Sequence, residues 1–481
     1  MKYFVGLLTA LMLVTISCQK REIQNKDRDM VDVNGLTVNK TDFMNRYRAS
    51  KEFAASKSIT PEGVKKFLDQ NFVDDLLLVN KAIDEGLDKD STIEEGLKRL
   101  KVQAMTSMDG ALYHKVMAKP AVVKEEEIRA LYKRSDHGVR IAYIRLSSKH
   151  MADSLYNAIK HGADFGEMAR KYSLDVQTFQ RGGEVPTTLY PGLLGDEIEN
   201  VMFKMKAGQV SKPIYSSGWY YLIKVLKTSK MKLKSFDQEK ENLRRKVQQA
   251  KNNQHRNNYI DSLFIRFHLK INKEMFPVIK QAFVPVDRVG KIDESKIPHA
   301  LWNKPLATYD GGEFSLGQFV SMYNGMNFTS RVPLHYDDEI ENHIKTLVVP
   351  YLMYQDGVQM GLQNSDDFKL LYEKMRTNAL KQEALRKFVY EKVQVTDDEV
   401  KSYYEQHKQE WNNQPFQKIE RFAKNRLKAE KAKQYKEQLT RRLRNSYTVV
   451  YNDSLIAAVA TSLDNMKKSG PMFRVPNFQR K

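Results

Sequence analysis

The stretch RIAYIRL (140–146) opens the segment that decides the fold, which runs from Arg140 to Lys227 in a chain of 481 residues. Its apolar and polar residues alternate as in a half-buried strand, and a helical period begins at Met151. Glycine-turn, helix and strand patterns follow in YSLDVQTFQRGGEVP (172–186), IENVMFKMKAGQVSKPIY (198–215) and GWYYLIKVLK (218–227). We predict strand, helix, helix, glycine turn, short strand, helix and two strands, which is a compact α+β domain.

Two motifs inside this segment resemble a known family. Tyr172-Ser173-Leu174-Asp175 with the following Gly182-Gly183 matches the family pattern Tyr/Phe-Ser-x-Asp/Cys and its glycine turn, and AGQVSKPIYSSGW (207–219) fits a Gly-Glu-x-Ser-x-Pro run. These motifs resemble the parvulin family of peptidyl-prolyl cis-trans isomerases. The resemblance implies rotation about X–Pro bonds, a reaction that needs no nucleophile, metal or cofactor, so we expect none of the three.

The resemblance also assigns residues to a site. Asp175 takes the position of the acidic or thiol group that faces the substrate carbonyl. The family usually carries a histidine on its first and on its last strand, and this chain has tyrosines there instead. The residues at the implied catalytic positions are Asp175, Tyr143, Tyr220 and Tyr221. The implied apolar lining, which would bind the substrate, is formed by Val185, Leu194, Ile198 and Phe203. In this lining, Ile198 replaces an aromatic residue of the family. Tyrosines donate hydrogen bonds but differ from histidines in size and pKa, so both an isomerase and a domain that only binds peptides are open readings.

The N-terminus reads as an export signal. A basic start at Lys2 precedes an apolar run from Tyr3 to Ile16, which is too short to span a bilayer and is typical of a signal-peptide core. The end of this run, Thr-Ile-Ser-Cys, resembles a bacterial lipobox, and Cys18 is the only cysteine in the chain. We expect lipidation of Cys18, and a charged tether follows it to residue 29. The alternative is an incidental cysteine that is removed with the signal.

The net charge of +20 comes from 79 Lys and Arg against 59 Asp and Glu. The basic residues are spread along helical stretches such as KENLRRKVQQAK (240–251), which is typical of a solvated helix face. An exported protein meets little nucleic acid, so we expect no nucleic-acid partner. Weak attraction to anionic lipid or to acidic client proteins is a further hypothesis.

His150 and His161 lack nearby carboxylates or cysteines at ligand spacing, and we expect no metal site there.

Four pairs of segments recur in the same order along the chain. NGLTVNKTDF (34–43) aligns without a gap to DGGEFSLGQF (310–319), an offset of 276. The next pairs begin at Gly86 and Gly361, at Val123 and Val395, and at Phe236 and Phe416, with offsets of 275, 272 and 180. The offset falls by 92 between the third and the fourth pair, so the second copy lacks 92 residues that the first contains. That number is about the size of the parvulin-like stretch. We predict one helical module in two copies, with the α+β domain inserted in the first between Arg134 and Leu233; the alternative is convergent helix and hairpin patterning.

This organisation resembles the SurA-type and PrsA-type periplasmic folding factors, which carry a parvulin domain on a helical chaperone module. The predicted segments are a signal peptide at 1–17, a tether at 18–29, a first helical module at 30–135 and 230–275, the parvulin-like domain at 136–229, a second helical module at 305–460 and a tail at 461–481. We expect a foldase and chaperone of the cell envelope, lipid-anchored on the periplasmic side of the outer membrane, with unfolded X–Pro-containing proteins as partners. The alternatives are a non-catalytic holdase and a structural subunit of an envelope secretion or assembly machine.

Overall fold

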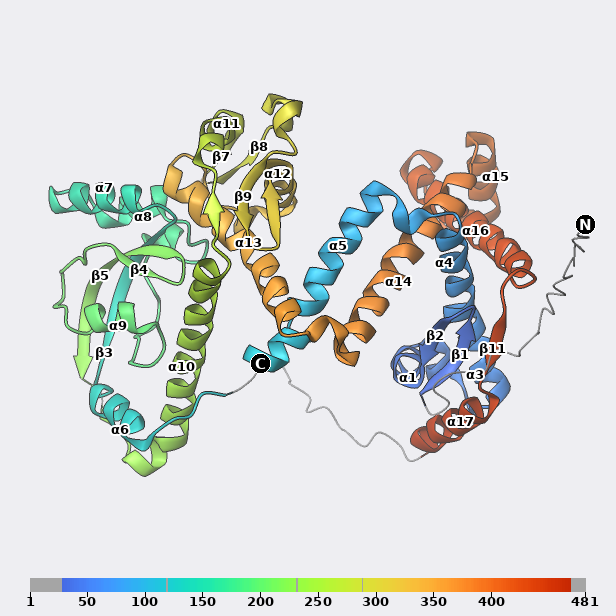
Figure 1. The fold of residues 1–481 in the computed structure, drawn as a ribbon, viewed down its shortest axis with the longest axis horizontal. Coiled ribbons are helices and arrows are strands. Elements are labelled where there is room, and N and C mark those ends of the chain that lie inside the picture. Colours follow the sequence, from blue (N-terminus) through green and yellow to red (C-terminus); the bar gives the residue numbers. More distant parts are fainter. Residues whose placement is uncertain (1–27, 118–119, 231, 288, 469–481) are drawn as a thin grey trace, which may run out of the picture. The chain divides into compact units, whose positions relative to one another are not determined.

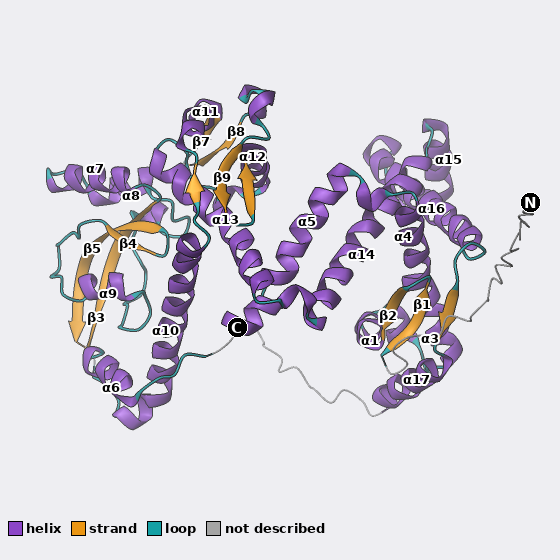
Figure 2. Ribbon diagram, in the orientation of Figure 1, coloured by secondary structure: helices purple, strands orange, loops and turns teal. Residues whose placement is uncertain are grey.

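The computed structural model describes residues 28–117, 120–230, 232–287 and 289–468. The chain divides into two compact units, one made of residues 1–98 and 373–481 and the other of residues 99–372. In these described ranges helices predominate and the strands form four small sheets (Figure 2), which confirms the mixed α+β class. Within the described ranges, no helix has the length and apolar character needed to cross a bilayer. Cys18 and most of the predicted tether lie outside the described residues.

The first unit joins the two ends of the described chain around one core. Buried side chains near the N-terminus, such as Phe43 and Leu77, pack in the same cluster as Val459 and Leu463 near the C-terminus. Its elements are β1 (Asp29–Val33), β2 (Leu36–Asn39), α1 (Lys40–Arg48), α2 (Lys51–Ala55), α3 (Pro61–Leu68), α4 (Asp74–Asp84), α15 (Asp397–His407), α16 (Phe416–Leu443), β11 (Val449–Tyr451) and α17 (Asp453–Lys468). Helices α5 (Ser91–Thr106) and α14 (Asp366–Phe388) continue from this unit into the second.

The second unit contains the segment singled out in the sequence and a helical part beside it (Figure 1). Its elements are α6 (Glu125–Arg134), β3 (His137–Leu146), α7 (Lys149–Lys160), α8 (Phe165–Tyr172), α9 (Asp196–Met202), β4 (Ile214–Ser216), β5 (Trp219–Lys230), α10 (Phe236–Arg266), β6 (Lys270–Ile271), α11 (Phe276–Ala282), β7 (Phe283–Val286), β8 (Val289–Ile292), β9 (Pro305–Tyr309), β10 (Gly312–Ser315), α12 (Leu316–Gly325) and α13 (Asp337–Gln359).

The inserted domain is built on the sheet β3-β5-β4, which is antiparallel throughout. β3 and β5 are its first and last strands, and His137 at the start of β3 lies opposite Lys230 at the end of β5. The two ends of the domain are therefore neighbours, and α6 and α10 lead directly into and out of it. A domain whose ends meet can be inserted at a loop without separating the flanking helices.

Strand alternation gives this sheet two different faces. Ala142, Ile144 and Leu222 pack against helices α7 and α8 on one face. Ile141 and Ile223 belong to a second cluster, on the opposite face, together with residues of α9. Because successive residues of a strand point to opposite faces, Tyr220 and Tyr221 enter different surroundings.

The predicted pairs of segments fold alike. Each hairpin leads into a helix whose first turn is capped by the residue before it, Asn39 for α1 and Ser315 for α12. The helix hairpin α6–α10 and the hairpin α15–α16 share a further detail. The Tyr132 ring lies 5.4 Å from the Phe236 ring and its hydroxyl donates to the Lys234 carbonyl at 2.7 Å. At the offset positions, the Tyr404 ring lies 5.3 Å from Phe416 and its hydroxyl donates to the Gln414 carbonyl at 2.5 Å.

The structure groups the repeated segments differently from the predicted modules. The first hairpin, β1 and β2, pairs through β1 with β11 near the C-terminus, whereas the second hairpin, β9 and β10, pairs through β9 with β6. β6 and β11 occupy equivalent places in the two copies, so each hairpin takes the return strand of the other copy. The reason lies in α5 and α14, each of which carries its copy from one unit to the other without a break.

Candidate functional site

Asp175 organises the turn that follows α8. Its carboxylate accepts hydrogen bonds from the backbone N–H of Thr178 at 2.9 Å and from the Thr178 hydroxyl at 2.6 Å. The residue is only 7% exposed. Aspartate side chains commonly accept hydrogen bonds from the turn that follows them. Here these hydrogen bonds hold the Asp175 carboxylate close to the glycine turn.

Gly182 and Gly183 bring the next segment against β3. Both have positive φ, of 65° and 84°. The Gly183 carbonyl accepts from the Tyr143 N–H, and the Val185 N–H donates to the Ile141 carbonyl, both at 2.9 Å. A Cβ at Gly183 would lie 2.3 Å from the Tyr143 carbonyl oxygen, so only glycine permits this approach.

Tyr143 and Tyr221 meet on this face of the sheet. Their ring centroids are 6.1 Å apart at an angle of 52°. Burial and the neighbouring Asp175 carboxylate raise the pKa of Tyr143 to about 12, and burial raises the pKa of Tyr221 as well. Both phenols are therefore neutral at physiological pH and keep an O–H that can donate a hydrogen bond.

Arg145 supplies a cation that the sequence prediction missed. Its guanidinium donates to the Leu174 carbonyl at 2.6 Å and lies 3.8 Å from the Asp175 carboxylate. It also covers the Trp219 ring, with 4.6 Å from its central carbon to the ring centroid. The signal was present in the sequence, because Arg145 is two residues from Tyr143 and so shares its face of the strand.

The four predicted apolar lining residues do gather beside these polar groups. Val185, Leu194, Ile198 and Phe203 all belong to the cluster on the Tyr143 face. The sequence prediction missed Glu199, which is buried and whose carboxylate accepts from the backbone N–H groups of residues 192 to 194 at 2.8–2.9 Å. The acidic first turn of α9 was the available signal, and this contact holds the Leu194 loop over the cluster.

Tyr220 does not join the site, which corrects the sequence prediction for this residue. It packs on the α7–α8 face, where its ring lies 5.0 Å from the Tyr215 ring. Strand alternation is the physical reason, because only one of two adjacent strand residues can face Tyr143. Tyr221 alone takes the position on the last strand.

His150 and His161, which were expected to be surface residues, each contact a neighbouring group. The His150 ring lies 4.9 Å from the Tyr336 ring at an angle of 34°, and a ring nitrogen of His161 hydrogen-bonds with the Asn157 carbonyl at 2.7 Å. Across the described ranges, no group of three His, Cys, Asp or Glu side chains could hold a metal ion. The groups that do converge are a carboxylate, a guanidinium and two neutral phenols beside an apolar lining, a set suited to binding a peptide group next to an apolar ring.

Comparison with known proteins agrees with this geometry. Residues 144–227 match the family model described as the PPIC-type PPIase (rotamase) domain, so this part of the chain is a parvulin-type domain. Foldase protein PrsA 4 of Bacillus cereus is 32% identical over 131 residues, which cover 27% of this chain and 45% of that protein. Foldase protein PrsA of Caldanaerobacter subterraneus is 25% identical over 269 residues, covering 50% and 87%. The chain spans less than half the length of each of the first three curated relatives.

Solved structures match as well. The peptidylprolyl isomerase PrsA from Bacillus anthracis is 20% identical with a TM-score of 0.23, and the match covers 44% of this chain and 85% of that one. A second match comes from a structural study of PEB4 and the periplasmic protein Cj1289, two SurA-like chaperones of Campylobacter jejuni. It is 18% identical with a TM-score of 0.21, and it covers 49% and 96%.

Proposed function

We propose that the chain is a peptidyl-prolyl cis-trans isomerase and foldase, with its active site on the Tyr143 face of the inserted domain. The observation that carries the proposal is the buried Asp175, which lies against Tyr143 and Arg145 beside the apolar cluster of Leu194, Ile198 and Phe203. The match of residues 144–227 to the PPIC-type domain supports it.

The reaction requires a twisted amide to be bound better than a planar one. Resonance sets a barrier of about 18–20 kcal/mol to rotation about a peptide bond. An apolar lining around the proline ring excludes water, and groups around the carbonyl stabilise it as conjugation is lost. In this proposal Ile198 and Phe203 contact the ring, and the Tyr143 and Tyr221 hydroxyls face the carbonyl.

Tyrosine in place of the family histidines has a consequence for pH dependence. A histidine changes its charge near neutral pH, whereas Tyr143, with a pKa of about 12, keeps its proton throughout that range. The tyrosines therefore predict an isomerisation rate that is flat between about pH 6 and pH 8.

The cellular setting is part of the same proposal. Lipidation at Cys18 would anchor the chain at the periplasmic side of an envelope membrane, and unfolded proteins with X–Pro segments would be its clients. The names of the similar PrsA foldases support the client class, and the lipobox resemblance supports the anchor.

A protease-coupled assay of a prolyl peptide tests the isomerase. We expect the full chain to accelerate isomerisation and Asp175→Ala to fall to the uncatalysed rate, because the carboxylate that holds the turn and faces Tyr143 is lost. Tyr220→Phe is the matched control from the opposite face and should retain the wild-type rate. Equal background rates for wild type and Asp175→Ala would overturn the isomerase and leave a holdase, which suppression of aggregation of an unfolded β-barrel protein would then measure.

A further inference from the structure

Helix α10 has an unusual middle section. The helix has 31 residues, but among them only Leu243 and Leu263 are buried. Between them the sequence is KVQQAKNNQHRNN (246–258), which is rich in amides and cations. Val247 packs against the small cluster between α6 and α10, but Gln249 and residues 253–256 are exposed, so these polar side chains are available for other contacts.

One short segment already shows what these side chains bind. The Ala121 N–H donates to the Asn252 side-chain oxygen at 2.8 Å, and the Gln248 side chain donates back to the Ala121 carbonyl at 3.0 Å. The Lys251 ammonium donates to the Val122 carbonyl at 2.7 Å, while the Val122 side chain remains 80% exposed. The helix therefore binds this extended segment through the backbone groups of Ala121 and Val122, while the Val122 side chain stays exposed.

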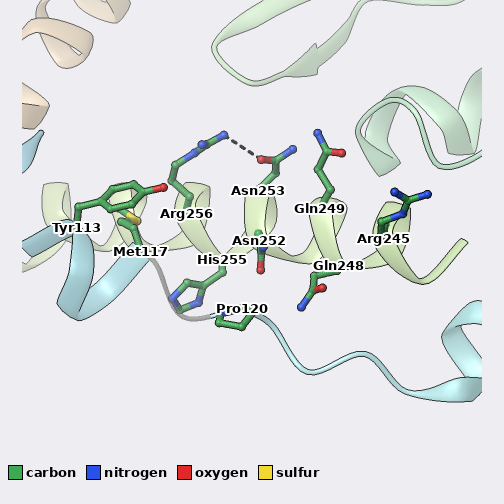
Figure 3. A pocket seen from close by; sticks show the side chains of 10 residues that line it. All are labelled: Tyr113, Met117, Pro120, Arg245, Gln248, Gln249, Asn252, Asn253, His255 and Arg256. Atoms are coloured by element: carbon green, nitrogen blue, oxygen red, sulfur yellow. Dashed lines mark hydrogen bonds between the residues drawn. The ribbon is translucent and has the colours of Figure 1, made fainter. Parts of the chain in front are cut away.

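A hollow of about 400 Å³ adjoins this contact. Tyr113, Met117 and Pro120 line it together with residues of α10, whose Gln249 and Asn253 side chains point to the opposite side of the helix from Gln248 and Asn252 (Figure 3). On the helix, Gln249 and Asn253 repeat the four-residue amide spacing of Gln248 and Asn252. Residues four apart lie on one face of a helix, so a second pair of amides borders the hollow.

The charge of the hollow is positive. Arg245 and Arg256 lie at the two ends of the helix stripe, His255 lines it too, and none of the ten lining residues is acidic. The stripe from Arg245 to Arg256 measures about 16 Å along the helix, which matches roughly five residues of extended chain.

We propose that this stripe of α10 is a second polypeptide-binding site, which takes an extended, acidic segment of an unfolded client through its backbone. The Ala121 contact is the pattern for the binding, with two side-chain amides pairing with the backbone N–H and the backbone carbonyl of one residue. The arginines favour carboxylates by charge complementarity. The inference shares with the proposed function only the premise that the chain handles unfolded polypeptide.

Binding of a labelled, proline-free acidic hexapeptide to the full chain, followed by fluorescence anisotropy, tests the proposal. We expect Gln249→Ala with Asn253→Ala to weaken binding about tenfold, since two hydrogen-bonding groups are removed. The matched control is Gln254→Ala with Asn258→Ala, which removes the same residue types at the same spacing outside the hollow and should leave the affinity unchanged. Unchanged binding in the first double variant would overturn the site.

Two further arms separate backbone recognition from charge and from the isomerase site. The same peptide with N-methylated amides should bind about tenfold more weakly; equal binding would mean attraction by charge alone and would contradict the proposal. Asp175→Ala should bind the peptide as wild type does, whatever its isomerase rate. Loss of binding in Asp175→Ala would place the peptide on the Tyr143 face and overturn the second site.

Discussion

The two helix hairpins α6–α10 and α15–α16 begin and end alike but differ in what lies between their helices. In the first, residues 135–235 lie between the helices and include the parvulin-type segment 144–227, whereas in the second a short connection, residues 408–415, joins the helices. Both keep the same Tyr–Phe contact and the same hydroxyl-to-carbonyl bond at the junction. The difference teaches that the junction does not depend on the inserted domain, and that the domain's chemistry is carried by its own residues.

Making the first hairpin like the second has the largest expected effect. Replacing residues 135–235 by residues 408–415 should abolish isomerisation completely and leave the remaining helices folded. The reason is that α6 and α10 pack through a cluster of their own, which includes Ile128, Leu131 and Leu243. Isomerase assays and far-ultraviolet circular dichroism with thermal unfolding measure the two outcomes. Loss of cooperative unfolding in the shortened chain would show that the junction needs the domain.

The second largest effect is expected from a substitution that destabilises only the inserted domain. Gly183→Ala places a Cβ against the Tyr143 carbonyl at positive φ, and we expect it to destabilise the domain by about 3 kcal/mol. Gly162→Ala is the control, because Gly162 also has positive φ but has no atom within 4 Å of the added Cβ; it should lose about 1 kcal/mol. Hydrogen exchange resolved by segment should show faster exchange in β3 and β5 while α15 and α16 keep their protection. Equal losses in the two variants would argue against the close approach.

The contact between the inserted domain and α13 should respond to pH. Glu339 is 3% exposed and accepts from the Ser147 hydroxyl at 2.8 Å, and burial raises its pKa to about 7. The folded chain holds this proton at a pH where the unfolded chain has released it. The stability from Glu339 is therefore full below about pH 4.5 and is lost as pH rises to about 7, by up to about 3 kcal/mol.

Glu339→Gln should remove this dependence, and urea unfolding across that pH range measures it. Burial lowers the pKa of His343 on the same helix to about 4, and its contribution runs in the opposite direction. Only the difference between wild type and variant therefore reports Glu339. Glu341→Gln serves as a control on α13, because ion pairs with Lys273 and Lys345 lower the pKa of Glu341. Parallel stability curves for wild type and Glu339→Gln would refute the assignment.

The smallest effect comes from the shared junction itself. Tyr132→Phe and Tyr404→Phe each remove one hydroxyl that donates to a backbone carbonyl, and we expect each to lower the free energy of unfolding by about 1 kcal/mol. Chemical denaturation of the two variants checks this. A clear loss in only one of them would show that the two junctions are not equivalent.

The sequence predicted the local features well, because each has a local cause. The glycine turn, the position of Asp175 and the pairing of the first and last domain strands follow from turn chemistry and strand alternation. Tyr220 was misplaced, since two adjacent tyrosines on a strand look equivalent until the register of the sheet is known. Arg145 and Glu199 were missed because their partners, Asp175 and the loop before α9, meet them only after folding.

The exchange of β6 and β11 between the two hairpins could not be predicted from local patterns. Both strands follow a long polar helix and both lead into a further helix, so the local sequence pattern does not show which hairpin each strand joins. Which hairpin each strand joins is decided by the paths of α5 and α14 through the chain. Repeated modules therefore predict the elements but not which copy completes which sheet.

The most direct test of the isomerase is exchange NMR on a prolyl peptide with a catalytic amount of the full chain. Uncatalysed exchange takes tens of seconds or longer, so a peptide alone shows no cross peaks between its cis and trans signals on the NMR timescale. The proposed site predicts such cross peaks when the wild-type chain is added and none with Asp175→Ala. Absence of cross peaks with folded wild-type chain, or equal cross peaks with Asp175→Ala, would contradict it.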